Sequence, residues 1–168
     1  EVYGEVPNFS LIERSGQPVR LSDLAGRAWI VDFVFTNCTG PCPLLTRQMS
    51  NLQRPLTGYP DVLLVSITVD PERDTPRVLS DYAERYGAEG ERWLFLTGKK
   101  EDVYALIREG FKLVVEEGGG SGSHQMIHSL RFALVDGEGR VRSYYDGTDP
   151  ELAQKILPDV RALLREEG

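Results

Sequence analysis

Residues 29–43 read WIVDFVFTNCTGPCP, carry both cysteines of the chain, and decide its fold. The first seven residues form an apolar run that is typical of a buried central strand. Gly40 and Pro41 break this run at the point where the thiols occur, and a helical pattern follows at once. The two sulfurs are therefore predicted at a strand-to-helix junction, the edge where open α/β folds usually place their chemistry.

Cys38 and Cys42 are separated by three residues rather than two. This C-x3-C spacing favours soft-metal binding over general disulfide exchange. Thiolates at the start of a helix are stabilised by its partial positive charge, so a redox dithiol and a metal site are both chemically reasonable. A pair of thiolates favours Cu(I), and an added imidazole lets the set hold Cu(II) as well. A purely structural pair of core cysteines is disfavoured, because the thiols flank Thr-Gly-Pro in a loop.

Length and composition predict one soluble domain that spans residues 1–168, large enough to bury a core without disulfides. The net charge of −7 argues against nucleic acid and anionic membranes, and it leaves room for a basic protein partner or a cation. No apolar stretch approaches the length of a membrane span. Because the chain opens on Glu1 rather than on an initiator Met, we expect a signal or membrane anchor upstream.

Strand and helix patterns alternate along the chain. The first half predicts a hairpin over 7–21, a strand over 28–35, a helix from 43 to about 55, a strand over 62–69, and a helix over 76–86 capped by Asp74 or Thr75. The second half predicts a strand over 93–96, a helix over 102–108, a strand beginning over 111–115, and a mobile Gly/Ser-rich loop over 116–123. A hairpin over 130–145 and a last helix from 149, which Pro158 kinks or splits, complete the chain. This order predicts an α/β fold with a mixed central sheet, helices on both faces, and a hairpin near each end. With a dithiol at the start of the first helix, this is the three-layer thioredoxin-like arrangement.

Three motifs in order identify a family resemblance that covers roughly residues 6–165. The first is Asp-Phe-Val-Phe-Thr at 32–36 leading into Cys38-x3-Cys42-Pro; the second is Val-Ser-Ile-Thr-Val-Asp-Pro-Glu-Arg-Asp-Thr-Pro at 65–76; the third is His128-Ser-Leu before the Asp-Gly-Glu-Gly turn at 136–139. Together these motifs resemble the soluble domain of the Sco/SenC family, copper-handling proteins that serve cytochrome c oxidase assembly.

The resemblance implies a copper metallochaperone whose ligands are Cys38, Cys42 and His128, with one Cu(I) or Cu(II) ion per chain. It implies that the copper is delivered to the dinuclear copper centre of cytochrome c oxidase subunit II, with another copper chaperone as a further candidate partner. It also implies a membrane-tethered domain on the outer, periplasmic-side face of the cytoplasmic membrane.

Residues 125–130 bear on the choice between metal binding and redox chemistry. Thioredoxin-like reductases normally open the strand that faces the dithiol with a cis-proline, whereas this stretch has no proline and carries His128 instead. His124, at the end of the Gly/Ser loop, is a competing ligand that we expect to be solvent-exposed, and Met126 is a soft candidate ligand that we expect to pack. Relatives often carry an acidic residue where Ile127 stands and a proline where Thr39 stands, which affects the tuning of the site rather than its ligands.

Asp70 and Arg73 lie in a segment that reads as a strand end, a turn and a helix cap. The resemblance places this segment beside the copper loop, so either residue is a candidate for docking a partner or orienting a cysteine. Two other functions remain open. One is a thiol–disulfide reductase, with Cys38 and Cys42 as its catalytic pair, that keeps the partner's copper-ligand cysteines reduced. The other, weaker one is a peroxiredoxin-like peroxidase, for which Phe35 stands at the position where that family needs proline.

Overall fold

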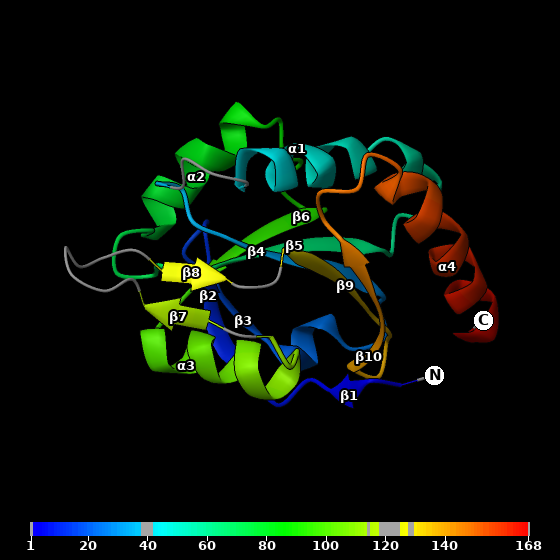
Figure 1. Cartoon of the computed structure of the whole chain (residues 1–168), viewed down its shortest axis with the longest axis horizontal. Helices are drawn as coiled ribbons and strands as arrows, with labels where there is room; N and C mark the ends of the chain where they lie inside the picture. Colours follow the sequence, from blue (N-terminus) through cyan, green and yellow to red (C-terminus); the bar gives the residue numbers. More distant parts are fainter. Residues whose placement is uncertain (1, 38–41, 114, 118–124, 128–129, 168) are drawn as a thin grey trace.

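A computed structural model of the chain describes residues 2–37, 42–113, 115–117, 125–127 and 130–167. Its strands are β1 (Gly4–Glu5), β2 (Ser10–Glu13), β3 (Pro18–Arg20), β4 (Trp29–Val34), β5 (Leu63–Thr68), β6 (Trp93–Thr97), β7 (Val115–Glu117), β8 (Gln125–Ile127), β9 (Arg131–Val135) and β10 (Arg140–Asp146). Eight of them form one sheet in the order β1-β10-β9-β4-β5-β6-β2-β3, and β7 pairs with β8 in a separate two-stranded sheet (Figure 1).

The centre of the large sheet is parallel and buried. Strands β4, β5 and β6 run parallel, and all six residues of β4 and of β5 are buried. Strands covered on both faces are expected to be almost continuously apolar, which explains the run that starts at Trp29. The predicted hairpins are confirmed: β2–β3 extends the sheet beyond β6, and β9–β10 extends it beyond β4.

Helices cover both faces of this sheet. They are α1 (Cys42–Leu52), α2 (Pro76–Arg85), α3 (Lys100–Ala105) and α4 (Leu152–Glu167), with 3-10 turns at Leu21–Leu24 and Pro55–Gly58 and a π-helical turn at Leu106–Gly110. The first, second and fourth helices pack on one face around Ile30 and Leu64, whereas α3 and the π-helical turn pack on the other around Val31 and Phe33 (Figure 1). The mixed sheet between two helical layers confirms the predicted thioredoxin-like class.

Four predicted elements differ in the structure. The helix predicted over 102–108 begins earlier, at Lys100, and ends in the π-helical turn. The strand predicted to begin over 111–115 forms only from Val115, because Lys112 has a left-handed backbone (φ 57°) that breaks the extended run, while Phe111 and Leu113 pack into the core. This strand continues to Glu117, so the first two residues of the loop predicted over 116–123 are extended, and the rest of that loop lies outside the described residues. The last helix begins at Leu152 rather than at 149, and it continues past the exposed Pro158 without being split.

A glycine brings the turn after β10 against α1 and the start of β9. The amide of Gly147 donates a hydrogen bond to the Leu130 carbonyl (2.7 Å), and the Gln48 side chain of α1 donates to the carbonyl of Gly147 (3.3 Å). A Cβ atom at position 147 would lie 2.6 Å from the Leu130 oxygen, closer than real Cβ contacts allow. Only glycine permits this approach, which ties the start of β9 to α1.

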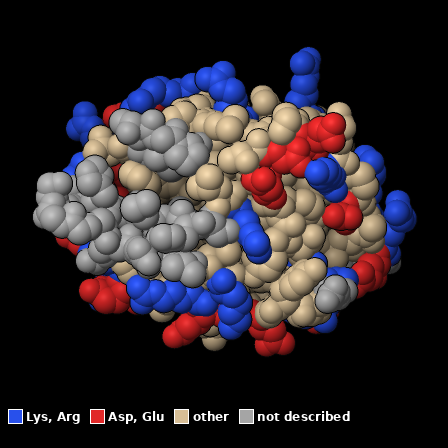
Figure 2. All heavy atoms as spheres, viewed as in Figure 1, with Lys and Arg blue, Asp and Glu red and all other residues tan. Residues whose placement is uncertain are grey.

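Charged side chains of both signs are spread around the face of the molecule in Figure 2. The net charge of −7 is therefore not gathered there into one acidic patch. Within the described ranges, no helix has both the length and the apolar composition needed to cross a membrane.

Candidate metal and thiol site

Several chain segments converge at one edge of the sheet. Strands β4 and β5 end side by side there, with Val34 opposite Thr68, and helices α1 and α2 begin just after them. Strand β9 runs antiparallel to β4 and therefore begins at the same edge. Open α/β folds usually bind their ligands and carry out their chemistry at the carboxyl ends of the parallel strands, so this edge is the candidate site.

The structure describes the predicted site residues only in part. Cys42 is the first residue of α1, and Met126 lies in β8. Cys38, His124 and His128 lie outside the described residues. In the parts of the chain that are described, no three His, Cys, Asp or Glu side chains are grouped so that they could hold a metal ion.

The side chain of Asp74 connects the segment that follows β4 to the end of β5 at this edge. Its Oδ2 accepts hydrogen bonds from the Thr36 amide (3.0 Å) and the Thr68 hydroxyl (2.7 Å), and its Oδ1 accepts one from the Thr36 hydroxyl (2.5 Å). The carboxylate is fully buried. A buried carboxylate requires such donors, because an unpaired charge in the interior is very costly.

Of the two residues predicted to cap α2, the structure selects Thr75. The residue has extended backbone angles, and its hydroxyl accepts a hydrogen bond from the Val78 amide (3.4 Å). This arrangement is an N-cap, and Pro76 at the first helical position suits it. The side chain of Asp74 is thereby left to contact the segment that follows β4.

Asp70 is also nearly buried beside this edge. Its carboxylate lies 3.4 Å from the Arg73 guanidinium, and its amide donates to the Thr68 hydroxyl (3.0 Å). Burial, followed by the negative charge of Asp74, raises the pKa of Asp70, and the charge of Arg73 partly offsets this. The carboxylate that contacts Thr36, in the segment leading to Cys38, is that of Asp74. The roles expected for Asp70 and Arg73, docking a partner or orienting a cysteine, stay predictions.

Asp32 is a second fully buried carboxylate, in the middle of β4. It accepts a hydrogen bond from the Ser66 hydroxyl (2.5 Å), which in turn accepts one from the Trp93 indole (3.0 Å). Its other oxygen, Oδ2, is buried and has no hydrogen-bond partner in the described parts of the chain. Burial raises the pKa of Asp32 to about 7, even though the Ser66 hydrogen bond favours the ionised form.

We expect Asp32→Asn to change how stability depends on pH. Because the pKa rises from 3.8 in the unfolded chain to about 7 in the fold, the folded protein keeps a proton that the unfolded chain loses between these values. Wild-type stability therefore falls as pH rises from about 4 to 7, by up to about 1.4 kcal/mol per unit and about 4 kcal/mol in total. Relative to wild type, the Asn variant should gain stability across this window.

Denaturant unfolding of reduced, metal-free protein at pH 4, 6 and 8 measures this difference. Asp136→Asn is the matched control, because hydrogen bonds from Arg140 and neighbouring amides outweigh the burial of Asp136 and lower its pKa. Because the pKa of Asp136 is lowered from 3.8, its protonation affects stability only below about pH 4, and the control should differ from wild type by a nearly constant amount between pH 4 and 8. A difference between Asp32→Asn and wild type that stays constant with pH would contradict the assignment.

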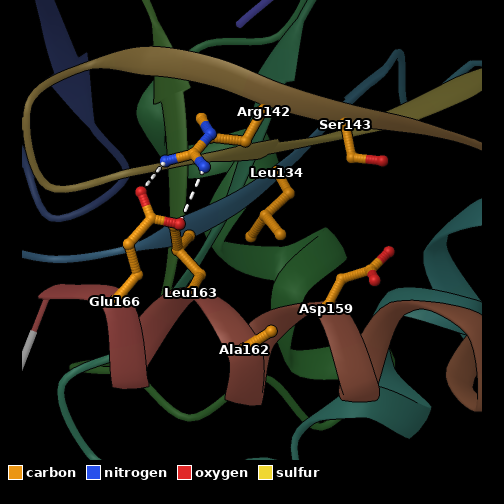
Figure 3. A pocket seen from close by; sticks show the side chains of 7 residues that line it. All are labelled: Leu134, Arg142, Ser143, Asp159, Ala162, Leu163 and Glu166. Atoms are coloured by element: carbon orange, nitrogen blue, oxygen red, sulfur yellow. Dashed lines mark hydrogen bonds and ion pairs between the residues drawn. The ribbon is translucent and has the colours of Figure 1, made fainter. Parts of the chain in front are cut away.

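A hollow of about 200 Å³ lies away from this edge, between β10 and α4 (Figure 3). Its polar side chains are already paired: Arg142 contacts Glu166 (2.9 Å) and Asp136 (3.2 Å), and Asp159 accepts a hydrogen bond from Tyr145 (2.6 Å). These contacts join α4 to the C-terminal hairpin. We therefore assign this hollow a structural role.

The sequence contains a signal for Asp32 but none for Asp74. A carboxylate in an otherwise apolar strand predicts a buried charge, and buried charges shift their pKa. Asp74 lies in a turn with Asp70 and Glu72, where helix capping explains it equally well. Only the way the loops fold against each other distinguishes it.

Comparisons with known proteins give one consistent result. A model of the SCO1/SenC family matches residues 3–165. A protein of Stutzerimonas stutzeri, named as a candidate for copper binding, is 31% identical over 163 residues, which covers 92% of this chain and 76% of that protein.

Two solved structures resemble the chain over nearly its whole length. A SCO1/SenC family lipoprotein from Bacillus anthracis has a TM-score of 0.88 at 29% identity, covering 96% of this chain and 95% of that one. BsSco, described as a Sco family cytochrome c oxidase assembly protein with a disulfide switch, has a TM-score of 0.85 at 34% identity, covering 97% and 95%.

Proposed function

The chain belongs to the SCO1/SenC family, and we propose that it is a copper metallochaperone that binds one Cu(I) or Cu(II) ion through Cys38, Cys42 and His128. The observation that carries this proposal is the position of Cys42, the first residue of an 11-residue helix that follows a buried strand. The positive end of such a helix favours the thiolate over the thiol. Copper binding needs thiolates, so the framework suits this chemistry.

The ligand types support copper over harder metals. Two thiolates are soft ligands that suit Cu(I), and the imidazole of His128 would complete a set able to hold Cu(II). The relative from Stutzerimonas stutzeri, named as a candidate for copper binding, points to the same metal. Calcium and magnesium prefer oxygen ligands, which this set does not supply.

We propose the dinuclear copper centre of cytochrome c oxidase subunit II as the destination of the copper. The support is the description of BsSco as a member of a family of oxidase assembly proteins. Transfer would proceed by ligand exchange, in which thiolates of the partner replace those of Cys38 and Cys42 one at a time. A second copper chaperone is proposed as the donor.

We propose that the domain is tethered at the outer face of the cytoplasmic membrane. The support is the relative from Bacillus anthracis, which is described as a lipoprotein. In Figure 1 strand β1 lies below the sheet at the right, whereas α1 starts above the sheet, left of centre. A tether that precedes residue 1 would therefore leave the candidate site free to meet a partner.

A thiol–disulfide reductase acting on the partner's copper-ligand cysteines is the second candidate function. The disulfide switch ascribed to BsSco favours it. Both functions use the same dithiol, so they are distinguished by comparing two reaction rates. The rate at which reduced, metal-free protein reduces the partner is compared with the rate at which copper-loaded protein transfers its metal.

A copper titration followed by ultraviolet–visible spectroscopy tests the proposed function. We expect thiolate-to-Cu(II) charge-transfer bands that grow up to one equivalent of copper and then stop, because the chain supplies one pair of thiolates. The reduced protein titrated with Zn²⁺ provides the baseline without such bands. A spectrum that shows only free Cu(II) at one equivalent would reject copper binding.

A further inference from the structure

The segment that leads from β4 toward Cys38 is attached to its neighbour by one buried carboxylate. Three hydrogen bonds reach Asp74, two from Thr36 and one from Thr68, at 2.5–3.0 Å. Thr36 lies two residues before Cys38 in the sequence. Thr68 is the last residue of β5 and pairs with the last residue of β4. The carboxylate therefore links Thr36, two positions before Cys38, to the end of β5 in the centre of the sheet.

Asp74 is itself held in place by backbone hydrogen bonds. Its amide donates to the Asp70 carbonyl (2.8 Å), and the Thr75 amide donates to the Arg73 carbonyl (3.1 Å). Helix α2 begins at once, with Pro76 at its first position. Because a tight turn, a capped helix and the Thr68 hydroxyl of β5 fix the carboxylate, the ordering imposed by its other two hydrogen bonds falls on Thr36.

We propose that Asp74 is a positioning residue for the dithiol, and that its carboxylate fixes the segment carrying Cys38 relative to the start of α1, where Cys42 lies. The inference rests on the proposed function of these cysteines. A copper chelate and an intramolecular disulfide both require the two sulfurs to meet. A segment released from Asp74 would sample more conformations, so both events would become less favourable.

Two variants distinguish whether Asp74 acts by holding Thr36 in position or by its negative charge. In Asp74→Asn, the amide oxygen can replace Oδ2 and accept from the Thr36 amide and the Thr68 hydroxyl, while the NH₂ group faces the Thr36 hydroxyl, which can rotate to accept. Asn therefore preserves the link and removes the charge. Ala removes both. If Asp74 acts through its charge, Asn and Ala should behave alike.

The experiment measures two quantities on Asp74→Ala, Asp74→Asn and wild type. The first is Cu(I) affinity, by competition with a chromophoric chelator. The second is disulfide closure in metal-free protein, in which Cys38 and Cys42 pass two electrons and two protons to glutathione disulfide, which becomes two molecules of glutathione. We expect Ala to weaken both by about tenfold or more, the factor that one hydrogen bond to a charged group represents. The reduction potential should then rise by about 30 mV per tenfold change.

Asp136→Ala is the matched control for general destabilisation. Asp136 is equally buried and accepts hydrogen bonds from two amides in the β9–β10 turn, at the opposite end of β9 from the candidate site. It should lose stability to denaturant yet keep copper affinity and disulfide closure unchanged. Asp74→Asn should restore most of what Ala loses.

Each other result overturns the proposal. If Asp74→Ala keeps wild-type Cu(I) affinity and disulfide closure, the link does not position the dithiol. If Asp136→Ala loses as much of both as Asp74→Ala does, the effect is general destabilisation. If Asp74→Asn is as weak as Asp74→Ala, the effect is due to the charge. If Asp74→Ala does not fold, Thr36→Val, which removes one of the three hydrogen bonds, must show a smaller loss in both measurements. Wild-type protein that binds no copper would reject the proposed function, while disulfide closure would still test Asp74.

Discussion

Protein whose dithiol has been oxidised is expected to bind no copper, whereas reduced protein should take up one equivalent. Copper requires thiolates, and a disulfide supplies none. We expect Cys38 and Cys42 to close this disulfide in metal-free protein, because the Gly-Pro sequence at 40–41 is typical of a turn, and a turn can bring the α-carbons within the roughly 4.4–6.8 Å that a bridge needs. Copper per chain after desalting, with free thiols counted on the same sample, measures the effect.

Two controls separate the dithiol from other effects of oxidation. Reduction of the oxidised sample should restore one equivalent, which excludes damage that cannot be reversed. Cys38→Ser and Cys42→Ser should each lose the stoichiometric site, because one soft ligand remains where the chelate needs two. Equal copper content in oxidised and reduced protein would show that these cysteines are not the copper ligands.

Replacing His128 with Ala is expected to impair Cu(II) binding far more than Cu(I) binding. Cu(II) prefers four-coordinate tetragonal sites with nitrogen ligands, whereas thiolates at low coordination number satisfy Cu(I). We expect Cu(II) affinity to fall by more than the roughly 10–100-fold that loss of an outer-shell partner of a ligand costs. The charge-transfer bands should be lost or should decay rapidly as the metal is reduced, while competition for Cu(I) should show nearly wild-type affinity.

His124→Ala is the matched control, since the chain has two histidines and they lie four residues apart. It should change little, because the glycine-rich sequence before His124 makes ordering its side chain entropically costly. Neither substitution should unfold the domain, as neither position belongs to a predicted apolar stripe. The ligand assignment is wrong if His124→Ala removes the Cu(II) spectrum and His128→Ala leaves it intact.

Local sequence patterns were sufficient for the central part of the fold. The apolar runs at 28–35 and 62–69 predicted β4 and β5 to within one or two residues, because strands covered on both faces leave little room for polar side chains. The Gly-Glu-Gly turn and the Gly16 turn predicted both hairpins for a similarly local reason. The family, too, followed from three motifs in order, and the match to residues 3–165 confirms it.

Local patterns failed where tertiary contacts override the backbone preference. Phe111 and Leu113 alternate like a strand, yet the structure packs both into the core on either side of a left-handed Lys112. Strand β1 is too short to be recognised in the sequence and forms only because β10 offers an edge to pair with. In both cases a partner distant in sequence decides the conformation.

The sequence by itself determined the fold class, the family, and the position of Cys42 at the start of the helix that follows β4. Each of these depends on residues close together along the chain. The tertiary structure alone decided that the carboxylate of Asp74 contacts Thr36. It also decided that, in the core, the Ser66 hydroxyl donates a hydrogen bond to Asp32 and accepts one from the Trp93 indole. These contacts join separate strands and loops, and their geometry depends on how the sheet twists and packs, which no local pattern encodes.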